Sequence, residues 1–220
     1  MTSAGAAAPI QTVGVIGAGR MGQPIIGHLA RKGFTVLAHD VDDGKREAVV
    51  KLGGRWAASA REVARAAHAI LVCVGYDREL RELMAQGFLQ DAPSGTTVAV
   101  LATVHPRTVQ ALAELAGPLG VHVVDATMCR GGRAADEGTL LSFVAGDVDV
   151  VERLTPVLLS YSTDIVYTGG VGTAQVAKAA NNLILWACLV ADHEALALAG
   201  QYGVDVEALR QALLISSANN

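Results

Sequence analysis

The sequence is poor in aromatic residues and has no excess of basic residues. Aromatic residues make up 4% of the 220 residues, and the net charge at pH 7 is −4. The lysines and arginines are scattered along the chain, so the basic stripe that binds a phosphate backbone is missing. We therefore expect no nucleic-acid partner.

Cysteine and histidine patterns of a metal site are also missing. The three cysteines, Cys73, Cys129 and Cys188, are odd in number and widely spaced, and the six histidines include no H-x-x-x-H pair. Neither set has the ligand spacing of a zinc site, so we expect no metal. Widely spaced, unpaired thiols are typical of a reducing compartment, and we expect a cytoplasmic protein.

Long apolar runs are absent from the sequence. The longest, Leu183–Ala191, has about half the length of a membrane span, and we expect no membrane partner. Residues 1–9 lack the basic and apolar regions of a signal peptide. We interpret residues 1–11 as a disordered leader. Hydrophobic residues nevertheless make up 51% of the chain, enough to build a proper core.

One glycine-rich stretch stands out after the leader. Val13–Ile16 is an apolar run, and it leads into a G-x-G-x-x-G turn, Gly17–Gly22, that opens a helix. In such turns the first glycine permits the bend, the second lets a pyrophosphate approach, and the third lets the helix pack closely. The helix N-terminus attracts the anion. A second apolar strand, Thr35–Ala38, follows, as dinucleotide binding requires.

Asp40 is the expected contact to the cofactor ribose. It lies 18 positions beyond Gly22, close to the roughly 20-residue spacing at which an acid reaches a ribose hydroxyl. Its carboxylate repels a 2′-phosphate, and Asp42 and Asp43 add to that repulsion, so NAD is favoured over NADP. Lys45 and Arg46 lie close enough in the sequence to weaken this preference.

Strand and helix patterns alternate over most of the chain. Apolar runs separated by helical segments recur from residue 12 to residue 125, and they predict a Rossmann-type, doubly wound, mostly parallel α/β sheet. The strand at Val121–Val124 is expected to end at Asp125. Gly169–Gly172 resembles a hinge, so we expect a dinucleotide domain over 12–168 and the start of an all-helical substrate or dimerisation domain over 169–220.

The helical part looks incomplete. Thr173–Gln201 predicts one long helix, apolar nearly all round, which should be buried on most sides. Asp205 should cap one short helix after it. A long apolar helix with one short partner is not a finished domain, so we expect either further chain or a second subunit, and we predict a homodimer or higher homo-oligomer.

Four segments, taken in order, resemble the β-hydroxyacid dehydrogenase family, which includes 3-hydroxyisobutyrate and tartronate-semialdehyde enzymes. They are Gly17–Gly22, Ala102–Pro106, Asp125–Gly131, and Gly172 through Lys178 to Asn182. The resemblance implies a dinucleotide domain, a helical domain and an active site between them. It also implies the following contacts to the cofactor: Gly17, Gly19, Arg20, Met21, Gly22, Asp40, Val74, Gly75 and Thr103.

The resemblance also implies that Lys178 is the catalytic residue and that Asn182, one helical turn later, holds the substrate beside it. Oxidising an alcohol by hydride transfer requires a group that removes the hydroxyl proton. An amine can do this when desolvation or a nearby cation lowers its pKa. An alternative is that Lys178 only extends to solvent, and that Asn182 is structural.

The sequence departs from the family at the expected substrate loop. Cys129-Arg130-Gly131 replaces Ser-Gly-Gly, and Ala102 and His105 replace Ser and Asp around Thr103. Arg130 is either a bidentate carboxylate clamp or a surface residue, and Cys129 either faces substrate or fills space. Gly131 and Thr103 are further expected substrate contacts. These changes leave the hydride chemistry intact and the substrate identity open.

The sequence therefore predicts an NAD-dependent dehydrogenase that acts on a small, carboxylate-bearing 3-hydroxy acid. Two alternatives stay open at this point. One is a reductase of imines or other carbonyl-like groups on the same scaffold. The other is a protein that binds the dinucleotide without catalysis.

Overall fold

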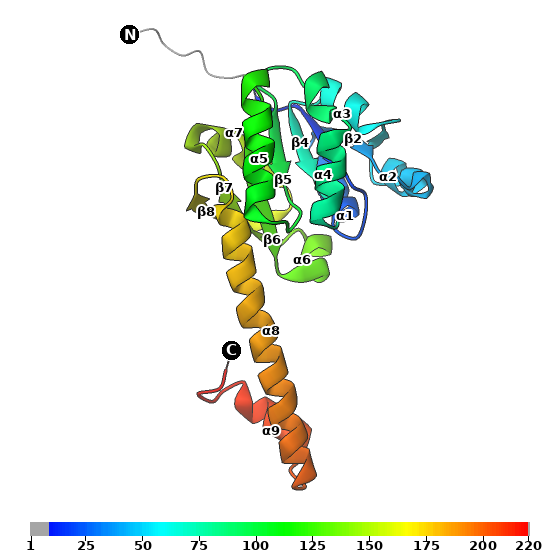
Figure 1. Cartoon of the computed structure of the whole chain (residues 1–220). Coiled ribbons are helices and arrows are strands. Elements are labelled where there is room, and N and C mark those ends of the chain that lie inside the picture. The colour runs from blue at the N-terminus through cyan, green and yellow to red at the C-terminus, as the bar shows by residue number, and fades with distance from the viewer. Residues whose placement is uncertain (1–8, 220) are drawn as a thin grey trace. The chain divides into compact units, whose positions relative to one another are not determined.

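The computed structural model describes residues 9–219, and its core is one eight-stranded sheet (Figure 1). The strand order is β3-β2-β1-β4-β5-β6-β7-β8. The strands β1 to β6 pair in parallel, β7 is antiparallel to β6, and β8 is parallel to β7. The bounds are β1 (Thr12–Ile16), β2 (Thr35–His39), β3 (Arg55–Trp56), β4 (Ala69–Val72), β5 (Thr97–Val100), β6 (His122–Cys129), β7 (Leu140–Ala145) and β8 (Ser162–Gly169).

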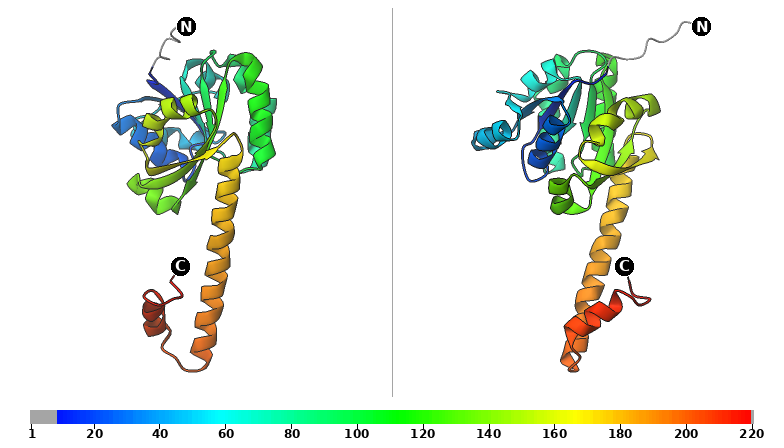
Figure 2. Two further views of the ribbon diagram at one scale, coloured as in Figure 1. Left: turned by 90° about the vertical axis from the view of Figure 1, so that its left-hand side faces the viewer. Right: turned by 180° about the vertical axis from the view of Figure 1, so that it is seen from behind.

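Helices cover both faces of this sheet. The α-helices are α1 (Gly22–Arg31), α2 (Arg46–Lys51), α3 (Ala60–Ala66), α4 (Asp77–Ala85), α5 (Pro106–Ala116), α6 (Gly131–Glu137), α7 (Val148–Leu158), α8 (Thr173–Gln201) and α9 (Val206–Leu213). Short 3-10 helices are η1 (Asp43–Lys45), η2 (Phe88–Asp91) and η3 (Gly117–Leu119). One core lies under α1, α2, α6 and α7, and a second lies under α3, α4 and α5. Figure 1 shows α3, α4 and α5 in front of the sheet, and the rear view in Figure 2 shows α1 and α7 behind it.

The predicted doubly wound, mostly parallel sheet is confirmed, and one expected strand end is wrong. The strand expected to stop at Asp125 continues to Cys129, because its last five residues pair with β7 in antiparallel register, from Asp125 opposite Ala145 to Cys129 opposite Leu141. This pairing is non-local, so the apolar pattern of Val121–Val124 did not reveal it. The extension carries Met128 and Cys129 beyond the edge at which the parallel strands end.

Buried polar groups hold the first turn of α8 against the sheet. The carboxylate of Asp125 accepts hydrogen bonds from the N–H groups of Gly172, at 3.0 Å, and Gln175, at 3.1 Å. The amide of Gln175, only 2% exposed, donates to Ala102 O and accepts from Val104 N–H. Burial raises the pKa of the Asp125 carboxyl, and the backbone hydrogen bonds oppose that rise. The start of α8 is therefore fixed to the ends of β5 and β6.

The chain divides into two compact units, residues 1–178 and 179–220. The expected leader, residues 1–11, lies mostly outside the described residues. The expected boundary after residue 168 falls at the end of β8, and the first turns of α8, through Lys178, stay with the first unit. These two domain expectations stay predictions.

The expectation that α8 is buried on most sides is wrong for the described residues. Only Ala174 and Gln175 of this helix are buried, and Leu183, Ile184 and Trp186 are among its exposed apolar side chains. By length and composition alone α8 is able to cross a membrane, with a mean hydropathy of 1.5. Core helices of soluble domains pass the same test, so the expected absence of a membrane partner and the expected homo-oligomer both stay predictions.

Replacing Gln175 with alanine is expected to destabilise the first unit. The substitution leaves the N–H of Val104 and the carbonyl of Ala102 without their buried partner, at a cost of about 1–3 kcal/mol. Urea unfolding of the variant measures this loss. Gln110→Ala is the matched control, because Gln110 bonds Val171 O at an exposed position. An equal loss in both variants would contradict the role of the Gln175 bridge.

Candidate functional site

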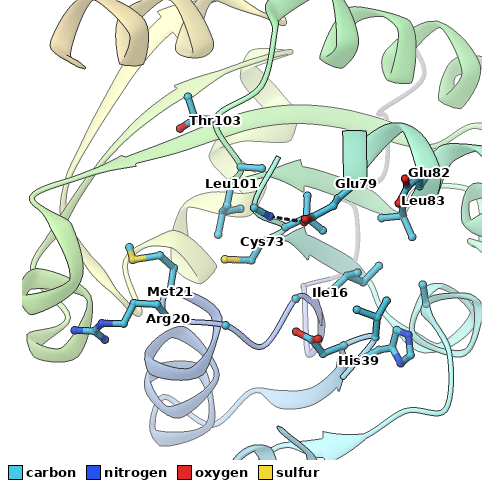
Figure 3. Close-up of a pocket in the computed structure, with 18 of the residues that line it drawn as sticks. Ile16, Arg20, Met21, His39, Cys73, Glu79, Glu82, Leu83, Leu101 and Thr103 are labelled. Atoms are coloured by element: carbon cyan, nitrogen blue, oxygen red, sulfur yellow. Dashed lines mark hydrogen bonds between the residues drawn. The ribbon is translucent and has the colours of Figure 1, made fainter. Parts of the chain in front are cut away.

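A cavity of about 780 Å³ opens at the carboxyl ends of the parallel strands in the first unit (Figure 3). Its walls come from the glycine turn after β1, the end of β2, the loops after β4 and β5, the end of β6 and the start of α8. Open α/β sheets bind their ligands at this edge, where the strand order reverses between β1 and β4. Predicted site residues that line it are Gly17, Gly19, Arg20, Met21, Asp40, Val74, Gly75, Thr103, Gly131 and Lys178.

The three turn glycines have different surroundings. Gly17 has a φ of 101°, and a Cβ there would lie 2.4 Å from the carbonyl oxygen of Cys73. A Cβ at Gly22, which is buried behind the cavity wall, would lie 2.0 Å from the carbonyl oxygen of Gly17. A Cβ at Gly19 would meet no atom within 4 Å. The first and third glycines are therefore required by the fold, whereas the second keeps open the space that a ligand needs.

Asp40 lies at the end of β2 and is 8% exposed. One carboxylate oxygen accepts from Ala18 N–H at 2.7 Å and from Lys45 Nζ at 2.9 Å, and the other accepts from Asp42 N–H at 3.0 Å. Burial disfavours the charged carboxylate, but these hydrogen bonds outweigh burial and hold the pKa of Asp40 below its ordinary value. Asp40 is therefore an ionised acceptor that is fixed in place before a ligand binds.

The loop after β4 contributes Cys73, Val74 and Gly75 to the wall. Burial raises the pKa of the Cys73 thiol to about 12, so this sulfur is not a nucleophile at neutral pH. The N–H of Gly75 donates to the carboxylate of Glu79 at 2.7 Å, as the dashed line in Figure 3 shows. Glu79 thus lines the cavity from α4 and fixes the loop.

Lys178 and Cys129 meet at the other end of the cavity. The Lys178 ammonium nitrogen lies 3.6 Å from the Cys129 sulfur. Cys129 is 6% exposed and lies behind the lining, while Met128, Ala102 and Gly131 line the wall nearby. The hydrogen bonds at the start of α8 place Lys178 beside Cys129, because they fix the turn that precedes Lys178.

Two predicted residues are placed elsewhere. The Arg130 side chain bonds to Asp164, Thr163 Oγ1 and the carbonyl of Thr139, with the ion pair to Asp164 at 2.7 Å. Its guanidinium does not line the cavity, and its acidic partner comes from β8. Of the two roles left open for Arg130, this placement favours the surface residue, and the carboxylate clamp stays a prediction. Asn182 belongs to the second unit, where its side-chain oxygen accepts from Asn181 at 3.2 Å.

Sequence reasoning missed several residues that shape the site. Glu79 belongs to no recognised sequence motif, and its spacing of four residues from Gly75 is the only sequence feature that indicates their hydrogen bond. The sequence pattern places Asp125 at the end of a strand and Gln175 inside a helix, and it assigns neither residue a role. Lys45 was seen as a nearby cation, but its direct ion pair with Asp40 depends on the turn between them.

Two family models match consecutive parts of the chain. The NAD binding domain of 6-phosphogluconate dehydrogenase matches residues 12–169. The NAD-binding domain of NADP-dependent 3-hydroxyisobutyrate dehydrogenase matches residues 172–220. The glycine turn and Lys178 thus each lie in a matched region.

Characterised proteins show the same likeness along the chain. A 2-(hydroxymethyl)glutarate dehydrogenase of Eubacterium barkeri is 30% identical over 94% of this chain and 70% of its own length. A 2-hydroxy-3-oxopropionate reductase of Escherichia coli is 31% identical over 92% of this chain and 70% of its own. The structure of Mycobacterium tuberculosis 3-hydroxyisobutyrate dehydrogenase with L-serine superposes with a TM-score of 0.89, at 25% identity, over 96% of this chain and 72% of that one.

Alanine at Gly19 should weaken NADH binding, whereas alanine at Gly22 should lower the stability of the fold. Gly19→Ala adds a methyl group in open space, so the thermal midpoint should stay unchanged while NADH binding weakens about 10-fold or more, because the pyrophosphate needs that space. Gly22→Ala drives a methyl group into the Gly17 carbonyl, so the fold itself should be destabilised. Fluorescence titration with NADH and thermal unfolding test both variants; a Gly19→Ala protein that binds NADH normally would contradict this assignment.

Proposed function

We propose that this chain, which belongs to the β-hydroxyacid dehydrogenase family, transfers a hydride between NAD and a small 3-hydroxy acid, with Lys178 as general acid and base. Members of the family are NAD(P)-dependent oxidoreductases. The observation that best supports the proposal is that one cavity contains the glycine turn, the ionised Asp40 and Lys178. A dinucleotide lying between the first two would bring its reactive end toward the third.

The cavity suits a nicotinamide dinucleotide on physical grounds. The open space at Gly19 accepts a phosphate that a Cβ would exclude. Met21, the N-cap of α1, makes no side-chain capping bond, which leaves the helix N-terminus free for an anion. Asp40 offers a fixed acceptor for ribose hydroxyls. When bound, the cofactor supplies the hydride acceptor for oxidation and the hydride donor for reduction.

Lys178 is the residue we assign to the proton. In oxidation its amine takes the hydroxyl proton as the carbonyl forms, and in reduction its ammonium returns that proton to the carbonyl oxygen. The side chain is partly buried, at the end of the cavity where Met128, Ala102 and Gly131 form an apolar wall. An apolar wall beside the amine favours direct proton exchange with a substrate bound against it. Asn182, one turn later in α8, is our second candidate for holding the substrate hydroxyl.

We assign NAD rather than NADP as the preferred cofactor because of Asp40. Its carboxylate is charged at neutral pH, since its pKa is lowered. A charged acceptor binds a 2′-hydroxyl and repels a 2′-phosphate. The ion pair with Lys45, at 2.9 Å, reduces that repulsion, so the discrimination should be moderate.

The substrate class follows from the family and from the loop at residues 128–131. Relatives act on hydroxy acids and on 2-hydroxy-3-oxopropionate by their names. We therefore favour a 3-hydroxyisobutyrate-like or tartronate-semialdehyde-like substrate. Lys178 together with Asn182 favours a hydroxyl-bearing substrate over an imine, because the amide is our candidate for holding the hydroxyl whose proton the amine exchanges. Paired assays with imines and hydroxy acids separate the two activities.

Lys178→Met should abolish turnover and spare cofactor binding. Methionine keeps the length of the side chain and removes the proton-exchanging group, so kcat with a responsive 3-hydroxy acid should fall about 10²–10⁴-fold. The measurement is NADH formation at alkaline pH with a panel of 3-hydroxy acids, alongside NADH fluorescence titration. Lys32→Met, at an exposed position of the first unit, is the control. Retained turnover in Lys178→Met would refute the role of the amine.

Removing the Asp40 carboxylate should change cofactor preference. The double variant Asp40→Ala/Val41→Arg deletes the repelling charge and adds a cation at the exposed neighbour, so the ratio of NADP to NAD efficiency should rise about 10-fold or more. Glu114→Gln removes an exposed charge on α5, outside the cavity wall, and should leave the ratio unchanged. Steady-state kinetics with both cofactors give the answer, and an unaltered ratio in the double variant would exclude Asp40 as the selecting residue.

A further inference from the structure

Arg20 stands in the glycine turn, yet its side chain leaves the phosphate site. Figure 3 shows it extending away from the end of the cavity where Ile16 and His39 lie. Its two terminal nitrogens bind both carboxylate oxygens of Asp136 in α6, at 2.7 and 2.6 Å. The bidentate pair holds the pKa of the Asp136 carboxyl below its ordinary value. The turn that receives the cofactor is thus joined directly to a helix far along the chain.

A glycine makes this contact possible. A Cβ at Gly132 would lie 2.7 Å from one terminal nitrogen of Arg20 and 2.9 Å from its guanidinium carbon. The planar guanidinium therefore lies flat against the backbone of α6, where any side chain would displace it. The orientation of Arg20 is set by packing as well as by charge.

His28, in α1, makes a second contact with α6. His28 Nε2 lies 3.0 Å from the carbonyl oxygen of Ala135 and 3.1 Å from that of Asp136. Both oxygens only accept, so Nε2 carries the proton, while Nδ1 accepts from Arg31 at 2.9 Å. A Cβ at Gly138 would lie 2.6 Å from the His28 ring. The two contacts hold the C-terminal half of α6, one against the glycine turn and one against α1.

Residues 128–131, which we call the 128–131 loop, comprise the end of β6, Arg130 and the first residue of α6, and they lie beside Lys178. Met128 and Gly131 line the cavity, and Cys129 touches the Lys178 amine. Arg130, inside this loop, has a φ of 82°, in the left-handed region that non-glycine residues seldom adopt. A loop with a strained residue needs external support to keep its conformation. The contacts of Arg20 and His28 with α6, which we call the clamp, supply such support directly after Arg130.

We propose that Arg20 is a positioning residue, whose ion pair with Asp136 holds the 128–131 loop against the dinucleotide turn and so couples cofactor binding to substrate binding. The pair is exposed on both sides, so it contributes little to global stability. Its geometry is what matters, because a small displacement of α6 moves the residues beside Lys178. The inference rests on the proposed function, in which this loop contacts the substrate.

Asp136→Asn is the clean test, because Asp136 does not line the cavity. The variant should raise KM for the responsive 3-hydroxy acid about 10-fold, change kcat less, and leave NADH affinity in the absence of substrate within about 2-fold of wild type. Gly132→Ala should reproduce the effect by displacing the guanidinium. The control is Arg133→Gln, which breaks the exposed Arg133–Glu137 pair on the same helix and should change neither value.

Hydrogen exchange gives a readout that does not depend on turnover. NADH should slow amide exchange at residues 128–138 in the wild-type chain, and this protection should be lost in Asp136→Asn and retained in Arg133→Gln. If NADH slows exchange at residues 128–138 in the wild-type chain but no hydroxy acid is turned over, the proposed function is refuted and the role of the Arg20–Asp136 pair is retained. Unchanged KM and unchanged protection in Asp136→Asn and Gly132→Ala would overturn the clamp and leave the proposed function standing.

Discussion

The buried carboxylate of Asp125 is the constraint on which the site depends. It ends the parallel part of β6 and accepts the N–H groups of Gly172 and Gln175, so it closes the N-terminus of α8 inside the protein. An unpaired carboxylate at that depth would be costly, and unpaired N–H groups would be too. Each satisfies the other, and Lys178 follows in the next turn. The position of the amine thus results from an anchor that lies three to six residues earlier in the chain.

At the end of the cavity beside β2, the charge of Asp40 is already paired with Lys45 when no ligand is bound. Asp40 receives three hydrogen bonds, one of them from the Lys45 ammonium. This arrangement keeps an acidic acceptor ionised at low exposure. The same pairing lessens the electrostatic penalty for a second negative charge nearby, so the proposed preference for NAD should be moderate.

Three kinds of contact meet at the loop of residues 128–131. The antiparallel pairing with β7 brings the loop beyond the strand edge, the Arg130 side chain fixes it to β8, and Asp136 of α6 joins it to Arg20 of the glycine turn. Arg130 therefore supports the loop through Asp164 while its backbone takes a left-handed conformation. A Gly in that position would relax the backbone and lose the anchor to β8. Arg130 in place of the family's glycine therefore fixes the loop through a side-chain ion pair, at the cost of a less favourable backbone conformation.

The sequence determined the sheet, the order of its helices, the glycine turn and the acid after β2, because these depend on short apolar runs, turn chemistry and local spacing. It also singled out Lys178, since a cation on an apolar helix is costly unless it is used. Tertiary structure alone decided where β6 ends, which partner Arg130 and Arg20 choose, and what fixes the start of α8. Those outcomes depend on contacts between residues 12 to 116 positions apart, from Cys129 with Leu141 to Arg20 with Asp136, which no local pattern encodes.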